Sequence, residues 1–243
     1  MAIGEAVNVA IRGCGVLEAV ARIVQLGGKP QHAPAVATLR AAFQARTGAF
    51  APDDPWYEER IRAFWCDAVT GGRLGRRVEA ELTAGERAWQ MPLERTHRGL
   101  FRLGGEGAGA GALLIDVWSG VALEVGVMDD ASRAELDASS GQLLDGRVLG
   151  ADDPFTVALL PGAVFHPRDA TPHIAPVLAA ARSQGLSTTD TLDALLRMHR
   201  ARSSLSRVKP AYAYRAEALS PQAPVLPHAV PRRPVRSDPR EPT

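Results

Sequence analysis

Before residue 95, apolar residues recur at the spacing of an amphipathic helix in four stretches of the chain. The stretches cover residues 5–27, 34–46, 54–70 and 83–94. The third is the best marked, because Asp54 can accept backbone N–H bonds as an N-cap and Pro55 suits the first turn. The pattern therefore predicts a helical region over residues 1–95.

Near Arg98 the pattern changes to short runs of β-forming residues separated by turn residues. The runs cover residues 100–103, 113–118, 121–127, 143–149 and 155–160. Short strands in this order must close on themselves or pack against helices to protect their edges. The sequence predicts an α+β fold with a small curled antiparallel β-sheet or barrel, of SH3 or OB size, over residues 96–166. Residues 129–136 are expected to form one helical turn across its end.

Helical periodicity returns after Phe165 and predicts C-terminal helices over residues 167–204. Beyond them, Pro and Arg are frequent and aliphatic residues are few. Such a composition cannot bury enough apolar surface to offset the entropy of ordering. Residues 205–243 are therefore predicted to be a basic, largely disordered tail, with disorder from about residue 216.

Charge is distributed unevenly along a chain whose net charge is only +1. Residues 96–166 contain four Arg against ten Asp and Glu, whereas residues 203–243 contain seven Arg and Lys against three acids. The acidic β-region argues against phosphate binding there. Nucleic acid is thus an unlikely partner except nonspecifically, through tail residues such as Arg232, Arg233 and Arg236.

The basic residues are nearly all Arg, with Lys29 and Lys209 as the exceptions, and Ala, Gly and Pro are abundant. This usage indicates a GC-rich bacterial genome. Cys14 and Cys66 belong to no metal-binding or redox motif and fit reduced, partly buried thiols. No window reaches the roughly 20 apolar residues of a membrane span. A cytoplasmic protein is predicted, without membrane association.

Several short motifs in one order, within residues 45–185, resemble a family of uncharacterised bacterial proteins with no assigned activity. They are Phe50-Ala-Pro-Asp-Asp-Pro-Trp-Tyr-Glu-Glu-Arg60, Phe64-Trp65, Leu82-Thr-Ala-Gly-Glu-Arg87, Arg98-Gly-Leu-Phe101, Asp116-Val-Trp-Ser-Gly120, Leu144-Asp-Gly-Arg147 and Phe165-His-Pro167. The resemblance implies an arrangement of helices, a small barrel-like domain and further helices, and it leaves the function open.

One compact group of possible metal ligands occurs, namely His166, Asp169 and His173. Imidazole and carboxylate at this spacing suit Zn²⁺ or a non-haem iron if a helix begins at Pro167. In the alternative, His166 bonds backbone at the helix start, Asp169 complements the helix dipole and His173 is solvated. The second interpretation is preferred, so no cofactor is predicted.

Other catalytic patterns are absent from the sequence. The glycine-rich residues 104–111 lack the Lys of a P-loop and lead into a strand, so they fit a hairpin tip. Ser119 lies outside a nucleophile-elbow motif. No catalytic residue is therefore assigned.

These exclusions favour a non-enzymatic protein-binding or scaffold module. Its best partner anchors are Trp56, Tyr57 and Trp65, because aromatic side chains dominate interface energies. The same three residues also fit a helix core. Two alternatives stay open: a metal-dependent enzyme using His166, Asp169 and His173, and an accessory nucleic-acid-binding protein using the basic tail.

Overall fold

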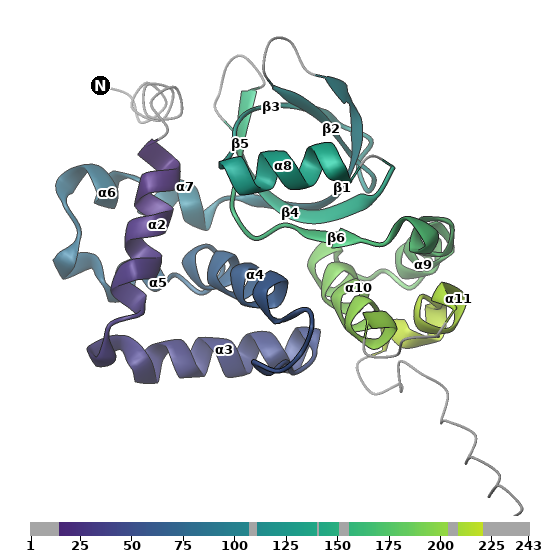
Figure 1. Cartoon of the computed structure of the whole chain (residues 1–243), viewed down its shortest axis with the longest axis horizontal. Helices are drawn as coiled ribbons and strands as arrows, with labels where there is room; N and C mark the ends of the chain where they lie inside the picture. Colours follow the sequence, from purple (N-terminus) through teal and green to yellow (C-terminus); the bar gives the residue numbers. More distant parts are fainter. Residues whose placement is uncertain (1–14, 107–110, 140, 151–155, 204–208, 221–243) are drawn as a thin grey trace, which may run out of the picture.

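The computed structural model describes residues 15–106, 111–139, 141–150, 156–203 and 209–220 of the chain (Figure 1). A set of helices, a small β-barrel and a second set of helices follow one another along the sequence. The predicted α+β class is thereby confirmed. None of the helices in these ranges is both long enough and apolar enough to span a membrane.

The N-terminal region contains three longer helices and several short ones. They are α2 (Gly15–Gly27), η1 (Pro30–His32), α3 (Ala33–Thr47), α4 (Tyr57–Val69), α5 (Leu74–Arg77), η2 (Glu79–Glu81), α6 (Ala84–Ala88) and α7 (Gln90–Glu94). Their apolar faces share one core, in which Ile23, Leu26, Phe43 and Phe64 are buried. Figure 1 shows α4 between α3 and the barrel.

The predicted start of the third helix is wrong. Helix α4 begins at Tyr57, and the Asp54 carboxylate instead accepts a hydrogen bond from the backbone N–H of Ala51 at 2.8 Å. Asp54 therefore closes a turn before the helix and does not cap it. The fourth predicted helix is divided at Trp89 into α6 and α7.

Five strands close into a barrel. They are β1 (His97–Glu106), β2 (Ala112–Asp116), β3 (Ala122–Val127), β4 (Leu143–Gly150) and β5 (Thr156–Leu159). The strand order is β1-β2-β3-β5-β4, and β1 also pairs with β4. All pairs are antiparallel except β3 with β5, which is parallel. The curled barrel is confirmed, with one parallel pair where only antiparallel pairing was expected.

One end of the barrel is closed by helix α8 (Asp130–Ala138), which connects β3 to β4. Asp129 caps this helix by accepting a hydrogen bond from the N–H of Ser132 at 2.6 Å. Leu136 of α8 packs into the barrel core with Phe101, Leu114 and others. The predicted helical turn at this end is thus a nine-residue helix. This strand order, with a helix after the third strand, is that of an OB fold.

After the barrel, strand β6 (Val164–His166) pairs with β4 and leads into the C-terminal helices. These are η3 (Arg168–Ala170), α9 (Thr171–Ser183) and α10 (Thr188–Ser203). Gly162, before β6, has φ of 99°, and a Cβ there would lie 2.5 Å from the Arg62 carbonyl. Glycine therefore lets this loop pack directly on α4.

Residues 209–220 correct the predicted start of the tail. They form α11 (Pro210–Ala213) and η4 (Ala216–Leu219), and Tyr214 and Leu219 are buried against α9 and α10. Arg197 of α10 also donates a hydrogen bond to the Leu219 carbonyl at 3.0 Å. Few apolar residues are enough here, because Ala213, Tyr214, Ala218 and Leu219 all enter the core of the C-terminal helices. Residues 221–243 lie outside the described part of the chain.

Two truncations are expected to differ in thermal stability. Removal of residues 221–243 should leave the melting temperature nearly unchanged, because a segment of this composition buries too little apolar surface to stabilise the fold. Removal of residues 209–243 should lower the melting temperature by several degrees, because it also removes buried Ala213, Tyr214 and Leu219. Differential scanning calorimetry of both truncations beside the full chain measures the difference. Equal melting temperatures would contradict the docking of residues 209–220.

Candidate functional site

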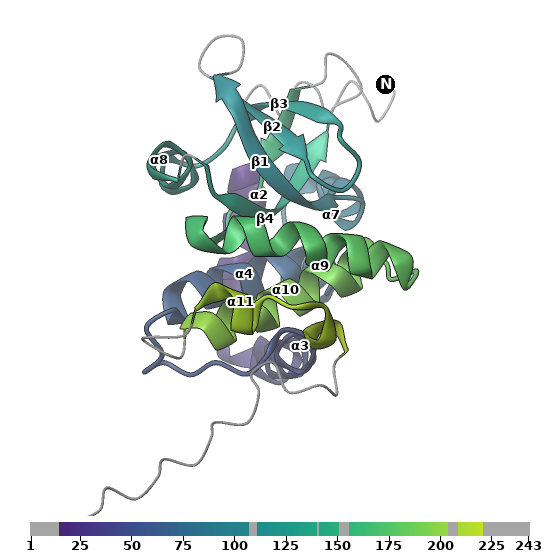
Figure 2. The ribbon, with the colours of Figure 1, turned by 90° about the vertical axis from the view of Figure 1, so that its right-hand side faces the viewer.

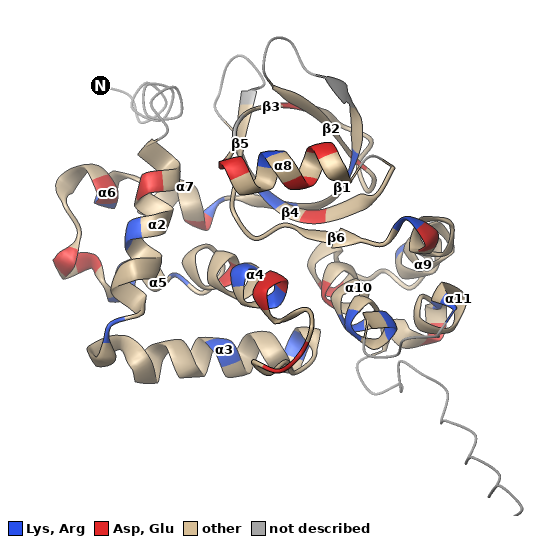
Figure 3. Cartoon of the chain, viewed as in Figure 1, with Lys and Arg blue, Asp and Glu red and all other residues tan. Residues whose placement is uncertain are grey.

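Six charged side chains form a continuous series of ion pairs where the barrel meets the helices. In order they are Arg147, Asp67, Arg46, Asp193, Arg98 and Asp145, and we call them the ionic junction. They come from α3, α4, α10 and barrel strands β1 and β4. Figure 3 shows acidic and basic positions on α4, α10 and β4. The ionic junction thus ties all three parts of the chain together.

Arg98 is the best-buried cation of the ionic junction, with 7% of its side chain exposed. Its Nε and Nη2 donate to the two oxygens of Asp145 at 3.0 and 2.7 Å, and its Nη1 donates to Asp193 at 2.6 Å. Burial alone would lower the pKa of Arg98, but the two carboxylates outweigh burial and raise it. The charge of Arg98 is therefore permanent.

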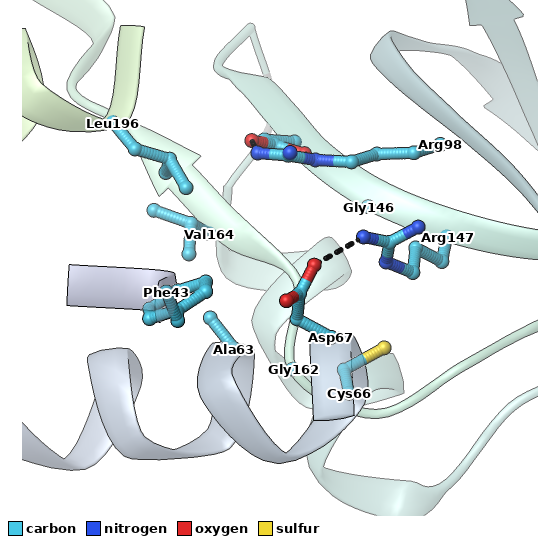
Figure 4. Close-up of a pocket in the computed structure, with 11 residues that line it drawn as sticks. Phe43, Ala63, Cys66, Asp67, Arg98, Gly146, Arg147, Gly162, Val164 and Leu196 are labelled. Atoms are coloured by element: carbon cyan, nitrogen blue, oxygen red, sulfur yellow. Dashed lines mark hydrogen bonds and ion pairs between the residues drawn. The ribbon is translucent and has the colours of Figure 1, made fainter. Parts of the chain in front are cut away.

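The space beside the ionic junction is too small for a ligand (Figure 4). Its volume is about 20 Å³, which is room for a water molecule, and Phe43, Cys66 and Asp67 are among its lining residues. Burial raises the pKa of the Cys66 thiol to about 11, so this thiol stays protonated and unreactive. Figure 4 also shows the ion pair between Asp67 and Arg147. We regard this region as structural.

The residues predicted as metal ligands occupy different environments. His166 of β6 is fully buried, and its Nδ1 shares a hydrogen bond of 2.9 Å with the Tyr214 hydroxyl. Asp169 is exposed and accepts a hydrogen bond from Arg202 at 3.3 Å, while His173 lies partly buried on α9. Among the described residues, no three or more His, Cys, Asp and Glu side chains are placed to hold a metal ion.

His166 belongs instead to a buried polar cluster, defined as Glu59, Arg60, His166, His199 and Tyr214. The rings of His166 and His199 meet edge to face, with centroids 5.5 Å apart. His166 Nε2 and His199 Nδ1 have no hydrogen-bond partner among the described residues. Two backbone carbonyls, of Thr47 and Leu196, accept hydrogen bonds from Arg60. Side chains far apart in the sequence thus share one low-dielectric region.

Burial dominates the proton equilibria of this buried polar cluster. It lowers the pKa of His166 to about 3 and that of His199 well below its ordinary value, with neighbouring positive charge acting in the same direction. Burial also raises the pKa of Glu59 to about 7, against the opposing hydrogen bond from the N–H of Phe165. The two imidazoles are therefore neutral at physiological pH.

The aromatic residues predicted as partner anchors pack on the protein itself. Trp56, Tyr57 and Trp65 are each partly buried against the core of the N-terminal helices. The guanidinium of Arg40 lies 5.9 Å from the ring centroid of Tyr57. Of the other predicted contact residues, Arg232, Arg233 and Arg236 lie outside the described residues.

A different surface, on the outside of strands β1, β2 and β3, presents aliphatic side chains to solvent. Burial alternates along β2, so partly exposed Leu113 and Ile115 point away from the barrel core. The strand register places Glu124 beside Leu113, and Arg102 and Ala122 beside Ile115. We call these five residues the β-face. Figures 1 and 2 show the C-terminal helices beneath the barrel, on its β4 and β6 side. Leu100 of β1 packs against these helices, whereas Leu113 and Ile115 are not part of that buried cluster.

A second feature that the sequence reasoning missed is a polar pair at the other end of the barrel from α8. His97 Nε2 donates a hydrogen bond to the Asp116 carboxylate at 2.9 Å. One sign was available in the sequence, because Arg98, Asp116 and Asp145 stand inside or beside predicted strands. A buried charge in a strand needs a partner. Which partner it finds depends on barrel closure.

Comparison with known proteins adds no functional assignment. No protein-family model matches the chain, and no curated protein or solved structure matches it. Functional inference therefore depends on the geometry of the chain itself.

Proposed function

We propose that this protein is a bacterial, cytoplasmic, non-enzymatic protein-binding or scaffold module that binds its partner on the β-face. The observation that carries the proposal is the pair of partly exposed aliphatic side chains, Leu113 and Ile115, on strand β2, which are not part of the core formed with the C-terminal helices. Aliphatic side chains on an accessible face favour association with another protein. The oppositely charged Arg102 and Glu124 beside them can orient that partner.

The composition of the β-face favours a protein over a single-stranded nucleic acid. OB folds bind oligonucleotides on this side with stacking aromatics and a basic groove. Here the β-face has one Arg and one Glu and no aromatic residue. Phe101 is buried in the barrel core, and Trp118 is covered by the Arg182 guanidinium at 4.8 Å from its ring centroid. Neither ring is free to stack on a base.

The rest of the structure supports a scaffold by making the barrel rigid relative to its helices. The ionic junction connects β1 and β4 with α3, α4 and α10. Oriented, desolvated ion pairs of this kind fix geometry even where they add little net stability. A rigid body of this form presents the β-face without reorganisation, which lowers the entropic cost of binding.

Replacement of Ile115 by aspartate tests the proposal. The matched control is Tyr212→Asp, which changes an apolar side chain that is 55% exposed on the C-terminal segment. Ile115→Asp should reduce recovery of a co-purifying protein by about tenfold or more, because it places a charge in the apolar centre of the contact. Tyr212→Asp should leave recovery unchanged. Quantitative mass spectrometry of material purified after nuclease treatment measures both.

Two outcomes would contradict the proposal. The first is equal recovery of the partner by both variants, because the β-face would then not be the contact. The second is loss of the partner on nuclease treatment, because a nucleic acid would then mediate the association.

A further inference from the structure

The open end of the barrel contains a pocket with a volume of about 330 Å³. It is lined by Arg95, His97, Asp116, Ser119, Val121, Leu123, Val148, Gly150 and Val157. These residues lie in or next to the start of β1, the end of β2, the start of β3, the end of β4 and the start of β5. Helix α8 connects the opposite strand ends, so the pocket lies at the end that α8 leaves open. Its volume is within the range of small-molecule sites.

Most of the pocket wall is aliphatic. Val148 and Val157 are nearly fully buried and belong to the barrel core, so the pocket reaches down to that core. Leu123 and Val121 also line the pocket, and Val121 is 52% exposed. A short aliphatic chain in this pocket would remove these side chains from water, which stabilises the complex in proportion to the area buried.

The polar side of the pocket is centred on Asp116, whose carboxylate already accepts three hydrogen bonds. The donors are His97 Nε2 at 2.9 Å, the Trp118 N–H at 2.8 Å and the Ser119 hydroxyl at 3.0 Å. Burial alone would raise the pKa of Asp116, but these hydrogen bonds outweigh burial and lower it. Asp116 is thus a buried, ionised group that is engaged within the protein.

The groups that remain for a ligand are His97 and Arg95. The hydrogen bond from Nε2 to Asp116 holds the His97 ring in place. The other ring nitrogen is Nδ1, and the His97 side chain is 51% exposed. Only the protonated ring donates from both nitrogens, and in that form His97 can bridge Asp116 and a second carboxylate. The exposed guanidinium of Arg95 lines the same pocket and favours a carboxylate through charge and paired N–H donors.

We propose that this pocket binds a small aliphatic carboxylate, with the carboxylate between His97 and Arg95 and the aliphatic chain against Val121, Leu123, Val148 and Val157. Charge complementarity selects this class over a neutral or cationic amphiphile. The inference is independent of the β-face, because Leu113 and Ile115 do not line the pocket. Residues 151–155, which join β4 to β5 in the sequence, lie outside the described residues.

Three probes of equal chain length test the charge preference. They are hexanoate, hexanol and hexylammonium, each titrated into the full chain and followed by methyl NMR of Val121, Leu123, Val148 and Val157. Hexanoate should shift these methyl resonances and bind more tightly than the other two probes. No shifts with any probe, equal affinity for hexanol, or tighter binding of hexylammonium would each overturn the proposal.

Variants assign the binding to named side chains. His97→Gln and Arg95→Ala should each lower the affinity for hexanoate by about tenfold. This factor corresponds to the loss of one charge-assisted hydrogen bond at a partly exposed site. Arg133→Ala, on α8 at the far end of the barrel, is the matched control and should leave the affinity unchanged. Equal weakening by all three would indicate nonspecific attraction and would overturn the assignment.

A fourth variant reverses the selectivity. Val121→Asp places a carboxylate on the exposed part of the aliphatic wall, so hexanoate binding should be lost and hexylammonium binding gained. Backbone amide spectra of each variant report whether the fold is retained. Retained hexanoate binding by a folded Val121→Asp protein would place the probe elsewhere and overturn the proposal. Partner recovery on the β-face should not change in any of these variants.

Discussion

Replacement of Arg98 by leucine is expected to lower the free energy of unfolding by about 3–5 kcal/mol. The guanidinium is nearly buried and binds two carboxylates, Asp145 and Asp193, which are each 5% exposed. Its removal leaves two negative charges in a low-dielectric region. Among the described residues, Asp193 keeps a second ion-pair partner, Arg46 at 2.8 Å, and Asp145 does not. The cost arises mainly from these uncompensated charges rather than from the loss of attraction.

Urea denaturation at pH 7 measures this effect, and two further variants identify its cause. Arg98→Leu combined with Asp145→Leu and Asp193→Leu should recover much of the lost stability, because the two carboxylates that lose their cation are then absent as well. Arg62→Leu should change stability by less than about 1 kcal/mol, because the Arg62–Glu135 pair is exposed by 40% and 36%. A cost below about 1 kcal/mol for Arg98→Leu would contradict the structural role of the ionic junction.

The sequence predicted the barrel because its strands have clear local patterns. Residues 113–118 and 143–149 nearly coincide with β2 and β4, whose β-forming residues and flanking turn residues are local properties. The parallel pairing of β3 with β5 could not be predicted, since it depends on how the sheet closes. Strand β6 has only three residues, which is too short for a periodic pattern.

The candidate sites were harder to predict because their residues are far apart in the sequence. His166 was singled out with Asp169 and His173, its neighbours in the chain, yet its actual partner Tyr214 is 48 residues away. Tyr214 lies in the predicted tail of residues 205–243, just before the expected start of disorder at about residue 216. The β-face was hidden for a different reason, because register decides which residues of adjacent strands share a surface.

The second large effect expected is an acid-dependent loss of stability caused by His166. Its pKa is lowered to about 3 in the folded protein, whereas an unfolded histidine has a pKa near 6.5. Between these values the unfolded chain binds a proton that the folded chain does not. The stabilising contribution of neutral His166 is therefore complete above pH 6.5 and is lost as the pH falls toward 3. Glu59 acts in the opposite sense, because its raised pKa of about 7 makes stability fall as the pH rises from about 4.5 to 7.

Comparison of the wild-type protein with His166→Gln isolates the histidine, since Glu59 is present in both. Glutamine does not titrate. When the pH falls from 7.5 to 4, the free energy of unfolding of the variant should therefore decrease by about 3 kcal/mol less than that of the wild-type protein. Urea denaturation at several pH values measures the change.

Tyr214→Phe is the matched control for this measurement. It removes the hydrogen bond to His166 at 2.9 Å but keeps the imidazole. This variant should lose about 1 kcal/mol at pH 7.5 and keep the wild-type acid dependence. The prediction fails if the free energy of unfolding of His166→Gln and of the wild-type protein shows the same dependence on pH. A buried neutral imidazole binds a proton less readily in the folded state than in the unfolded state, so its removal must change that dependence. The same result would show that the region around β6 and α10 admits water and a proton without unfolding, in contrast to the full burial of His166.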